Sequence, residues 1–488
     1  MSGPTGPKET SSLSIGRETL VSLVSKVLTM ATGFVGIVIF ANVLQDTGLG
    51  EYRTVLAAAF LLTQLPSGVG TAVRKRVSEV EADASPILGA GLVTFAAYAL
   101  LVGVGFLVSL PYAVDYFGSI ELAAGVVLVA VSVGLFKLLE PFYAGTGYPG
   151  LASWLDSGRS LLTLPLQVGL LIVGLQAFGL VVGLTVASVL ASLAAVAVAR
   201  VRPSLPDRET LDRIVEFARW SVPTNLLSNL YQSADVLILR AVAGAGAVGY
   251  YSAALQLAVP GAMFSTSIKQ ALTVKSSGVS SAGGQVREDL KNSLSYAGLL
   301  AIPILFGAMA FPQALMVTVF GSSFSDEPGL ALVGLALFQV SNAYRHPFEA
   351  TIEGTDRPAL VTRVNVAVVA VHLPLAFLLG RTYGLLGVIG STLVAEVLRV
   401  GTYQYTAHRH YGGVVFTRPM VDQFVAGAVM FLLVDAAVGR VVEITSWLTL
   451  LVPVVFGAVV YFGVLLAVSP HFRETLQYTV LDGTPLGK

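Results

Sequence analysis

The sequence has no cysteine and little charge. Among its 488 residues there is no Cys, and Asp, Glu, Lys and Arg together make up 12%. The absence of cysteine excludes disulfides, thiol catalysis and thiolate metal sites. A soluble surface needs about a quarter charged residues, so this charge content, with a mean hydropathy of +0.78, excludes a chain of soluble domains. Long apolar runs take their place and predict an integral membrane protein.

Segments of about 20 apolar residues recur along the whole chain, and each is long enough to cross a hydrocarbon core of about 30 Å. They lie at 19–43, 54–73, 87–110, 120–144, 158–175, 177–199, 218–242, 248–272, 294–318, 329–351, 359–380, 384–407, 420–439 and 446–469. The sequence therefore predicts an all-α, polytopic membrane protein with about fourteen transmembrane helices.

Positive charge is distributed unevenly over the predicted connections. On the side of the N-terminus we place 25 Lys and Arg residues, and on the opposite side only Arg53, Arg240, Arg381 and Arg440. Cytoplasmic connections carry the excess of Lys and Arg. We therefore expect a multi-pass protein of the cytoplasmic membrane with both termini in the cytoplasm.

Two short patterns occur once in each half of the chain. Residues 141–151 read PFYAGTGYPGL and residues 347–360 read PFEATIEGTDRPAL, while Gly48-x-x-x-Tyr52 is repeated 198 residues later as Gly246-x-x-x-Tyr250. A common spacing of about 200 residues indicates duplication, which in membrane proteins is typical of transporters with two lobes.

The segments and the repeat together predict a domain plan. Six crossings in each half give both copies the same orientation, so a pseudo-twofold axis should run along the membrane normal. We expect a cytoplasmic tail at 1–16, an N-lobe at 17–200, a cytoplasmic linker at 201–217, a C-lobe at 218–408, an extra helix pair at 409–469 and a cytoplasmic tail at 470–488.

Polar residues line one face of the tenth segment. Gln339, Asn342, His346, Glu349 and Glu353 are spaced by 3, 4, 3 and 4 residues, which places them on one side of a helix. Polar groups in a membrane need water, a ligand or a partner helix. The stripe is either the wall of a wet cavity or a set of interhelical hydrogen bonds with the two carboxylates reaching the cytoplasm.

Other intramembrane polar residues have a functional and a structural interpretation. In the seventh segment, which also carries Asn225 and Gln232, Asp235 is either a proton or cation site or the ion-pair partner of Arg240. In the first segment, Lys26 either extends to the cytoplasmic surface or meets an anion in a cavity.

In the twelfth segment, Glu396 forms either a structural ion pair with Arg399 or a pair that breaks during transport. By depth in their segments, Lys26, Arg240 and Lys269 are the candidates to meet a phosphate, and Asp235, Glu349 and Glu396 are the candidates for ion coupling. Asn225, Gln232, Gln339 and Asn342 complete the predicted cavity.

Sequence signatures of soluble enzymes are missing. There is no Walker loop, no G-x-S-x-G and no cluster of metal ligands. We expect neither an enzyme nor a bound cofactor, metal or nucleic acid, so transport would draw on an ion gradient, the membrane potential or the gradient of the substrate.

Residues 213–275 resemble polysaccharide flippases, the polysaccharide-transport branch of the multidrug/oligosaccharidyl-lipid/polysaccharide exporter superfamily. The likeness is carried by FARWSVP at 217–223, SADVLILR at 233–240 and GAVGYYSAA at 246–254, with Pro303 and Phe320-Gly321 in support. The resemblance implies two six-helix lobes that work by alternating access and move lipid-linked sugars outward. The extra helix pair favours this branch over the drug exporters, which usually have twelve crossings.

The resemblance also implies partners. The substrate would be a glycan linked to polyprenyl or dolichol phosphate, and the chain, expected to be a monomer, would serve glycosyltransferases and an oligosaccharyltransferase or polymerase. The 21 Arg against 8 Lys suit a GC-rich archaeon, in which the pathway would be protein N-glycosylation. Three alternatives stay open: a cation- or proton-coupled drug exporter, a membrane enzyme acting on lipid-linked sugars, and a scaffold without transport.

Overall fold

The computed structural model is helical throughout the residues that it describes. These are 15–79, 83–199, 201–281, 284, 286–412, 416–438 and 443–480, without the side chains of 15–30, 149, 198, 199, 228, 232 and 478–480. They form sixteen α-helices and a short 3-10 helix, and no strand occurs among them. The predicted all-α class is confirmed.

The α-helices have the following bounds. They are α1 (Ile15–Leu62), α2 (Gln64–Val77), α3 (Ala84–Phe117), α4 (Ile120–Gly145), α5 (Pro149–Ile172), α6 (Gln176–Ala199), α7 (Arg208–Ala258), α8 (Pro260–Ser281), α9 (Arg287–Ala297), α10 (Ala301–Ala310), α11 (Pro312–Phe320), α12 (Leu330–Gly354), α13 (Pro358–His410), α14 (Arg418–Ala437), α15 (Trp447–Val468) and α16 (Pro470–Val480).

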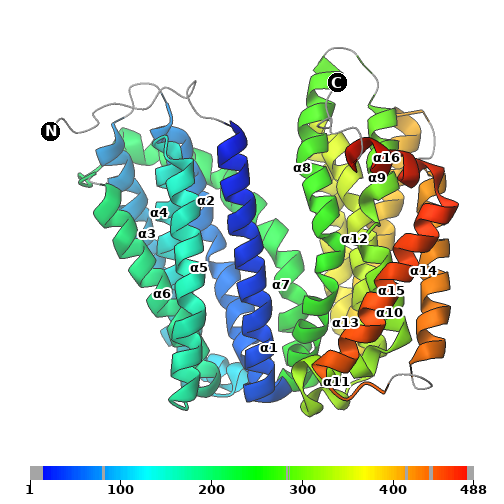
Figure 1. Cartoon of the computed structure of the whole chain (residues 1–488). Coiled ribbons are helices and arrows are strands. Elements are labelled where there is room, and N and C mark those ends of the chain that lie inside the picture. The colour runs from blue at the N-terminus through cyan, green and yellow to red at the C-terminus, as the bar shows by residue number, and fades with distance from the viewer. Residues whose placement is uncertain are drawn as a thin grey trace. The chain divides into compact units, whose positions relative to one another are not determined.

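The chain divides into two compact units, Met1–Gly249 and Tyr250–Lys488. In each unit long helices run side by side as a bundle (Figure 1). Helix α7 passes from the first unit into the second, so its first 42 residues, Arg208–Gly249, lie in the first unit. The lobe boundaries drawn from the sequence, 17–200 and 218–408, stay a prediction.

Three of the helices are broken by a residue with positive φ. The breaks lie at Gln45 (φ 62°) in α1, at Gly244 (φ 87°) in α7 and at Gly384 (φ 56°) in α13. At 1.5 Å per residue the 53 residues of α13 are long enough for two crossings. Nine described helices are long and apolar enough to cross a membrane. The chain is a multi-pass membrane protein, and the number fourteen stays a prediction.

The repeated sequence pattern forms the same turn in both units. In the first unit α4 ends at Gly145 and α5 begins at Pro149, and in the second α12 ends at Gly354 and α13 begins at Pro358. Proline suits the first turn of a helix, because a backbone N–H at that position has no intrahelical acceptor and its absence costs nothing. Each glycine also lies against a helix backbone: an added Cβ would stand 2.7 Å from the Arg74 carbonyl oxygen at Gly145 and 2.8 Å from that of Thr273 at Gly354.

A second pair of corresponding contacts joins α1 to the part of α7 in the first unit. A Cβ added to Gly50 would lie 1.8 Å from the Ala245 carbonyl oxygen, and one added to Gly249 would lie 1.9 Å from that of Asp46. Gly50 and Gly249 are 199 residues apart, as are Asp46 and Ala245 and the breaks at Gln45 and Gly244. The spacing of 198 inferred from the sequence is therefore one residue short, because it paired Gly48 with Gly246.

The segment expected as a linker, 201–217, is held against the first unit. Its Ser204 backbone N–H donates to the Ser85 carbonyl at 3.2 Å, and a Cβ added to Gly89 would lie 1.8 Å from the Ser204 carbonyl oxygen. Helix α7 begins within the segment, at Arg208, ten residues before the predicted crossing. The apolar pattern predicted only the membrane part of this helix, since its first turns are polar.

An ion-pair cluster holds the start of α7 to the end of α2. Arg213 Nη2 lies 2.5 Å from Glu79 Oε2, and Arg76 Nη1 lies 2.8 Å from Glu79 Oε1. The pKa of Glu79 is lowered from its ordinary value of 4.5, mainly by the hydrogen bond from Arg76, although desolvation opposes this shift.

The stabilising effect of this cluster should disappear in acid. Because the folded-state pKa of Glu79 is depressed, its contribution is full above the ordinary pKa and is lost as the pH falls through the folded-state pKa. We expect Glu79→Gln to lower stability by less than about 1 kcal/mol at pH 7 and to have no effect at strongly acidic pH. Melting curves of the two proteins across pH measure this, and Glu216→Gln, at an exposed site of α7, is the control. Equal differences at every pH would contradict it.

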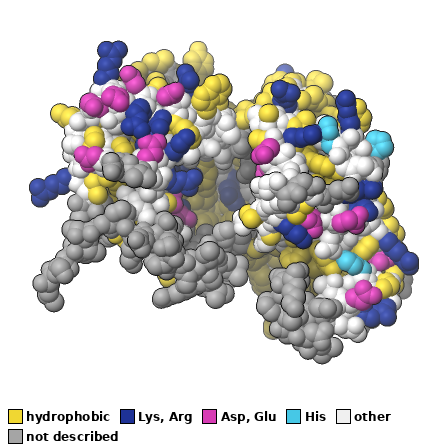
Figure 2. Space-filling view, turned by 90° about the horizontal axis from the view of Figure 1, so that it is seen from above, with side chains coloured by type: hydrophobic (Ala, Val, Ile, Leu, Met, Phe, Trp, Pro, Cys, Tyr) yellow, Lys and Arg dark blue, Asp and Glu magenta, His cyan; other side chains and the backbone are white. Residues whose placement is uncertain are grey.

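Charged side chains gather at one end of the helices. Figure 2 looks onto the upper end of Figure 1 and shows Lys and Arg mixed with Asp and Glu there on each unit. Helix α16, at the start of the segment expected as a C-terminal tail, lies across the helix ends on this side of the second unit (Figure 1).

Candidate functional site

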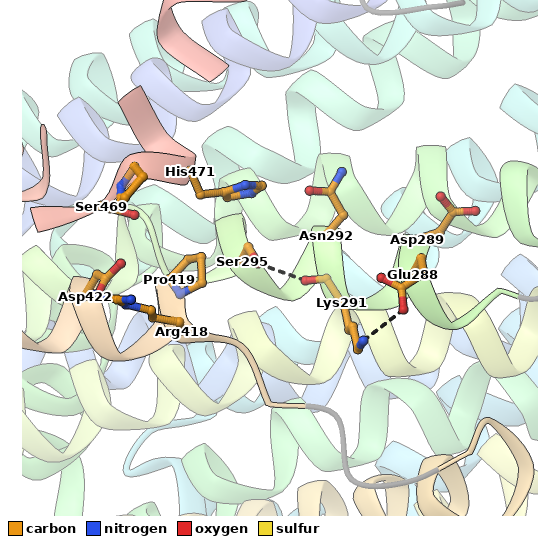
Figure 3. A pocket seen from close by; sticks show the side chains of 11 residues that line it. Glu288, Asp289, Lys291, Asn292, Ser295, Arg418, Pro419, Asp422, Ser469 and His471 are labelled. Atoms are coloured by element: carbon orange, nitrogen blue, oxygen red, sulfur yellow. Dashed lines mark hydrogen bonds and ion pairs between the residues drawn. The ribbon is translucent and has the colours of Figure 1, made fainter. Parts of the chain in front are cut away.

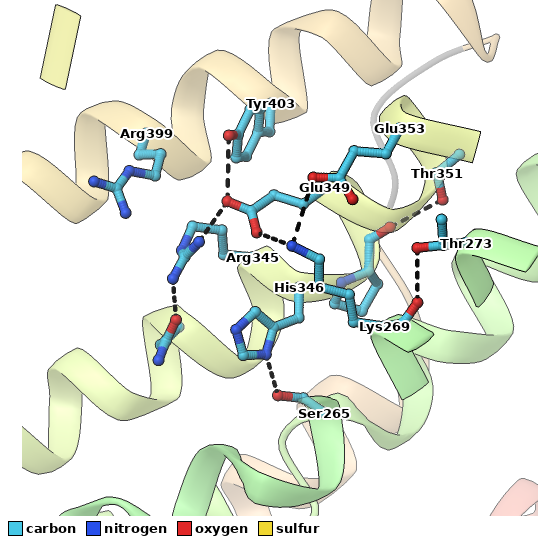
Figure 4. A network of polar contacts seen from close by, with 12 residues as sticks. Ser265, Lys269, Thr273, Arg345, His346, Glu349, Thr351, Glu353, Arg399 and Tyr403 are labelled. Carbon is cyan, nitrogen blue, oxygen red and sulfur yellow. Dashed lines mark hydrogen bonds and ion pairs between the residues drawn. The ribbon is translucent and has the colours of Figure 1, made fainter. Parts of the chain in front are cut away.

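The polar face of α12 lies inside the second unit and is bonded to two neighbouring helices. Gln339 and Glu349 are 5% and 3% exposed. Helix α8 contributes Lys269 and Ser265 to this region, and the part of α13 after its break contributes Arg399 and Tyr403 (Figure 4). The same part of α13 also contributes Glu396. The predicted stripe therefore faces partner helices, and its carboxylate Glu349 is buried instead of extending to the cytoplasm.

Glu349 is the centre of the network. Its Oε2 accepts a hydrogen bond from Lys269 Nζ at 2.8 Å, and its Oε1 accepts one from the Tyr403 hydroxyl at 3.3 Å and another from Arg345 Nη1 (Figure 4). A carboxylate buried to this degree is tolerated only when it is paired and hydrogen-bonded. The two cations and the hydroxyl supply that compensation.

A second carboxylate continues the network along α13. Glu396 is fully buried, its Oε1 accepts a hydrogen bond from Arg399 Nη1 at 2.8 Å, and its Oε2 lies 3.3 Å from Arg345 Nε. Arg345 therefore bridges Glu349 and Glu396. The ion pair between Glu396 and Arg399, which both interpretations drawn from the sequence require, is present in the structure.

Uncharged groups extend the network toward the other end of the stripe. The Asn342 side chain donates to Gln339 Oε1 at 3.1 Å and accepts a hydrogen bond from Arg345 Nη2. His346 Nδ1 lies 2.8 Å from the Ser265 hydroxyl of α8. All five members of the predicted stripe thus take part in contacts within the second unit.

The charges in this network balance, but their exposure differs. Its cations are Lys269, Arg345 and Arg399, and its carboxylates are Glu349, Glu353 and Glu396. The side chains of Lys269 and Glu353, 3.6 Å apart at their charged atoms, are 28% and 32% exposed, whereas Glu349 and Glu396 are 4% and 0% exposed. An anionic ligand would therefore reach the network first at Lys269.

The arrangement is one of ion pairs and not of metal ligands. Within the described part of the chain, no group of three His, Asp or Glu residues is placed to hold a metal ion. An ion-pair network can exchange partners when a ligand or a proton arrives, because each cation here has a carboxylate that competes with an incoming anion.

The candidates in the seventh segment lie in the first unit. Asp235 is 3% exposed, and Arg240 Nε donates a hydrogen bond to the Tyr116 carbonyl at 3.0 Å. The side-chain amide of Asn229 donates a hydrogen bond to the backbone carbonyl of Asn225 at 3.0 Å. It donates another to Gln64 Oε1 at 2.9 Å. Lys26 and Gln232 are further candidates whose side chains lie outside the described residues.

Of the ten candidate residues, five therefore come together in one network: Lys269, Gln339, Asn342, Glu349 and Glu396. Sequence reasoning missed Arg345, which it counted among the cytoplasmic positive charges, and Tyr403. The spacing gave a signal for Arg345, since it stands three residues after Asn342 and four before Glu349. It gave none for Tyr403, because the contact joins two helices.

Comparison with known proteins shows similarity to a family profile and to two curated proteins. A family profile described as "Polysaccharide biosynthesis protein" matches residues 158–327. The chain is 26% identical over 91% of its length to the "Probable flippase AglR" of Haloferax volcanii and covers 94% of that protein. It is 23% identical over 97% of its length to the "Probable low-salt glycan biosynthesis flippase Agl15" of the same organism and covers all of it.

Two solved structures share the fold. The lipid II flippase MurJ, in an inward closed conformation, superposes with a TM-score of 0.79 at 12% identity, covering 94% of this chain and 100% of its own. An inward-facing multidrug resistance MATE family transporter of the MOP superfamily superposes with a TM-score of 0.63 at 16% identity, covering 80% of this chain and 98% of its own. The chain thus has a MurJ-like fold. Its resemblance to the polysaccharide flippases is confirmed by the family profile and by two relatives that match nearly the whole sequence.

Proposed function

We propose that the protein is a flippase that moves a lipid-linked oligosaccharide or sugar across the cytoplasmic membrane by alternating access. The similarity to two flippases over more than nine-tenths of the chain supports the assignment. The observation that carries it is the buried, charge-balanced network of α8, α12 and α13, whose most accessible cation is Lys269.

The physical task explains why a network of this kind is useful. A sugar chain has many hydroxyl groups, and each costs several kcal/mol to bury without a hydrogen-bond partner. The isoprenoid tail, by contrast, gains about 0.8 kcal/mol for every CH₂ in the bilayer. The head group therefore passes along polar side chains while the tail stays in lipid.

The substrate phosphate is proposed to bind cationic side chains on this path. Lys269 already holds two carboxylates, Glu349 at 2.8 Å and Glu353 at 3.6 Å, so an incoming phosphate would replace one anion with another. Lys26 and Arg240 are the further phosphate candidates, and Asn225, Gln232, Gln339 and Asn342 are candidates for the sugar hydroxyls.

Coupling is proposed to involve the carboxylates Asp235, Glu349 and Glu396. If phosphate draws Lys269 away, Glu349 and Glu396 keep Arg345 and Arg399. The network is then left with one carboxylate in excess, which a proton or cation can balance. A membrane potential supplies about 2.3 kcal/mol per charge per 100 mV. Movement of one charge is enough to bias the cycle.

The cellular setting follows from the same proposal. The excess of positive charge on one side supports an orientation with both termini in the cytoplasm. The lipid carrier would be a polyprenyl or dolichol phosphate, glycosyltransferases would load it, and an oligosaccharyltransferase or polymerase would consume it outside. The protein would be a transporter without catalysis of its own, as the similarity to flippases suggests.

The test is deletion of the gene and complementation. Deletion should leave glycan-charged lipid facing the cytoplasm and surface proteins that lack glycan, and the natural gene should restore both. Complementation with Lys269→Gln should restore at least about tenfold less surface glycan than the natural gene, because the substrate phosphate loses its charge-assisted partner. The variant protein should still fold. Arg363→Gln, at an exposed arginine of α13, is the matched control and should complement fully. Normal surface glycans after deletion would refute the proposal.

One alternative is favoured by a specific observation. The MATE transporters share the fold, so an exporter of small molecules is the second candidate. In that case deletion would raise drug sensitivity and leave the surface glycans unchanged. The MATE structure covers 80% of this chain, whereas MurJ covers 94%. This difference is expected if, of these two structures, MurJ alone has a counterpart of the C-terminal helix pair, and it therefore supports the flippase assignment.

A further inference from the structure

A second polar site lies in the second unit, apart from the network of α8, α12 and α13. It is a pocket of about 570 Å³ at the charged end of the helices, where the first turns of α9, α14 and α16 meet (Figure 3). Its lining includes Lys291 and Asn292 of α9, Arg418 of α14, and Ser469 and His471 at the start of α16. The proposed transport path makes no use of these residues.

Three helix N-termini open on this pocket. The first residues of α14, Arg418 and Pro419, and of α16, Pro470 and His471, line it, together with Glu288 and Asp289 of α9. Backbone N–H groups in a first helical turn have no intrahelical partner, and the helix dipole makes this end positive. Pro419 and Pro470 have no N–H, so among these lining residues α14 and α16 offer the N–H groups of Arg418 and His471. Acidic side chains compensate α9, but the first turns of α14 and α16 contain none.

Two buried polar atoms of the lining have no hydrogen-bond partner among the described residues. They are Oγ of Ser469, a residue with no exposed surface, and Nε2 of His471. The His471 ring is held in place, since it stacks on Tyr296 with the ring centres 5.2 Å apart. Buried polar atoms in native structures normally have a partner, so both atoms point to a bound group that supplies one.

The carboxylates of the lining are already occupied by cations. Glu288 lies 2.8 Å from Lys291, and Asp289 lies 2.7 Å from Lys275, which stands on α8. Arg418 is 4.0 Å from Asp422 and its side chain is 81% exposed, so its guanidinium remains available to a ligand. Asp422 is the third carboxylate of the lining, so a phosphate that binds Arg418 replaces Asp422 at the guanidinium. The positive ends of α14 and α16 favour this exchange.

We propose that this pocket binds the phosphate ester of a membrane-lipid head group. The Arg418 guanidinium, His471 Nε2 and the backbone N–H groups of Arg418 and His471 bind the phosphate oxygens, and the Ser469 hydroxyl donates to the phosphate or to an adjacent head-group oxygen. This site is separate from the flipped substrate and does not depend on the proposed transport function.

The position of the pocket favours a lipid as the source of that phosphate. Helices α14 and α15, which lead to it, are both long and apolar enough to cross a membrane, so their ends lie at the level of the head groups. Beside the pocket, Phe472 of α16 stacks on Phe462 of α15 and gives an apolar wall for the lipid. A soluble phosphate ester would present the same chemistry without using that wall.

The test measures binding to the purified full-length protein in detergent. The probes are a short-chain phosphatidylglycerol, the matching diacylglycerol without phosphate, and glycerol 1-phosphate, each titrated while the melting temperature is recorded. His471→Phe keeps the ring stacked on Tyr296 and removes the nitrogen, and Arg418→Gln removes the charge. Each should weaken binding of phosphatidylglycerol by about tenfold, as expected for a lost hydrogen bond to a charged group.

Arg208→Gln is a closely matched control. Arg208 is also the first residue of a helix, is 96% exposed, and lies 4.0 Å from an aspartate four residues later, as Arg418 does. Tighter binding of phosphatidylglycerol than of glycerol 1-phosphate identifies the lipid as the source, whereas equal binding identifies a soluble phosphate ester with the same site. Equal binding of diacylglycerol, no binding of either phosphate probe, or no difference between Arg418→Gln and Arg208→Gln would overturn the proposal. Since no transport is measured, the result is independent of flipping.

Discussion

Replacing Glu396 with leucine should lower the free energy of unfolding by about 3–5 kcal/mol, the usual cost of removing one partner from a buried ion pair. Glu396 has no exposed surface and holds Arg399 at 2.8 Å and Arg345 at 3.3 Å. Leucine would leave Arg399 as a buried cation without its carboxylate, while Arg345 would keep Glu349. The melting temperature of the purified protein in detergent measures the change.

Two further variants show that charge, and not shape, is the cause. Glu353→Gln removes a carboxylate that is 32% exposed and 3.6 Å from Lys269, so it should cost less than about 1 kcal/mol. The double change Glu396→Leu with Arg399→Leu should recover most of the loss, because an apolar pair often replaces a buried ion pair at little cost. If the double variant melts no higher than Glu396→Leu alone, the proposed electrostatic origin is wrong.

Gly50→Ala should destabilise the first unit by about 3 kcal/mol, at the upper end of the range for overpacking. The new Cβ would stand 1.8 Å from the Ala245 carbonyl oxygen, and a backbone atom cannot rotate away as a side chain can. Helices α1 and α7 would have to separate where both are broken. Gly249→Ala should have an effect of similar size, because its Cβ would stand 1.9 Å from the Asp46 carbonyl oxygen.

Gly103→Ala should stabilise the protein, in contrast to Gly50→Ala. Gly103 lies inside α3, and a Cβ added there would meet nothing within 4 Å. Alanine is favoured over glycine in a helix interior by about 0.5–1 kcal/mol, so this variant should melt slightly above the natural protein. A loss at Gly103 as large as the loss at Gly50 would mean that close backbone approach is not the reason for the glycine.

The close contacts at Gly50 and Gly249 were only partly predictable from the sequence. The glycines at 50 and 249 stand inside the repeated pattern, but the sequence could not show which pairs correspond, since Gly48 and Gly246 gave an equally plausible match. The breaks at Gln45 and Gly244 decide the spacing of 199. The register of the repeat follows from which helix backbones are in contact, and the amino-acid sequence does not show these contacts.

The sequence by itself determined the helical class, the presence of several membrane-crossing helices, the internal repeat and the polar stripe from Gln339 to Glu353. All four are local properties, because hydropathy and a period of 3.6 residues act along one segment. Only the tertiary structure decided that Arg345 lies inside the network, that Lys269 meets Glu349 80 residues away, and that Ser469 and His471 share a pocket with α9 and α14. The rotation of each helix and the choice of its partners depend on the packing of many side chains at once, which no spacing within a single helix specifies.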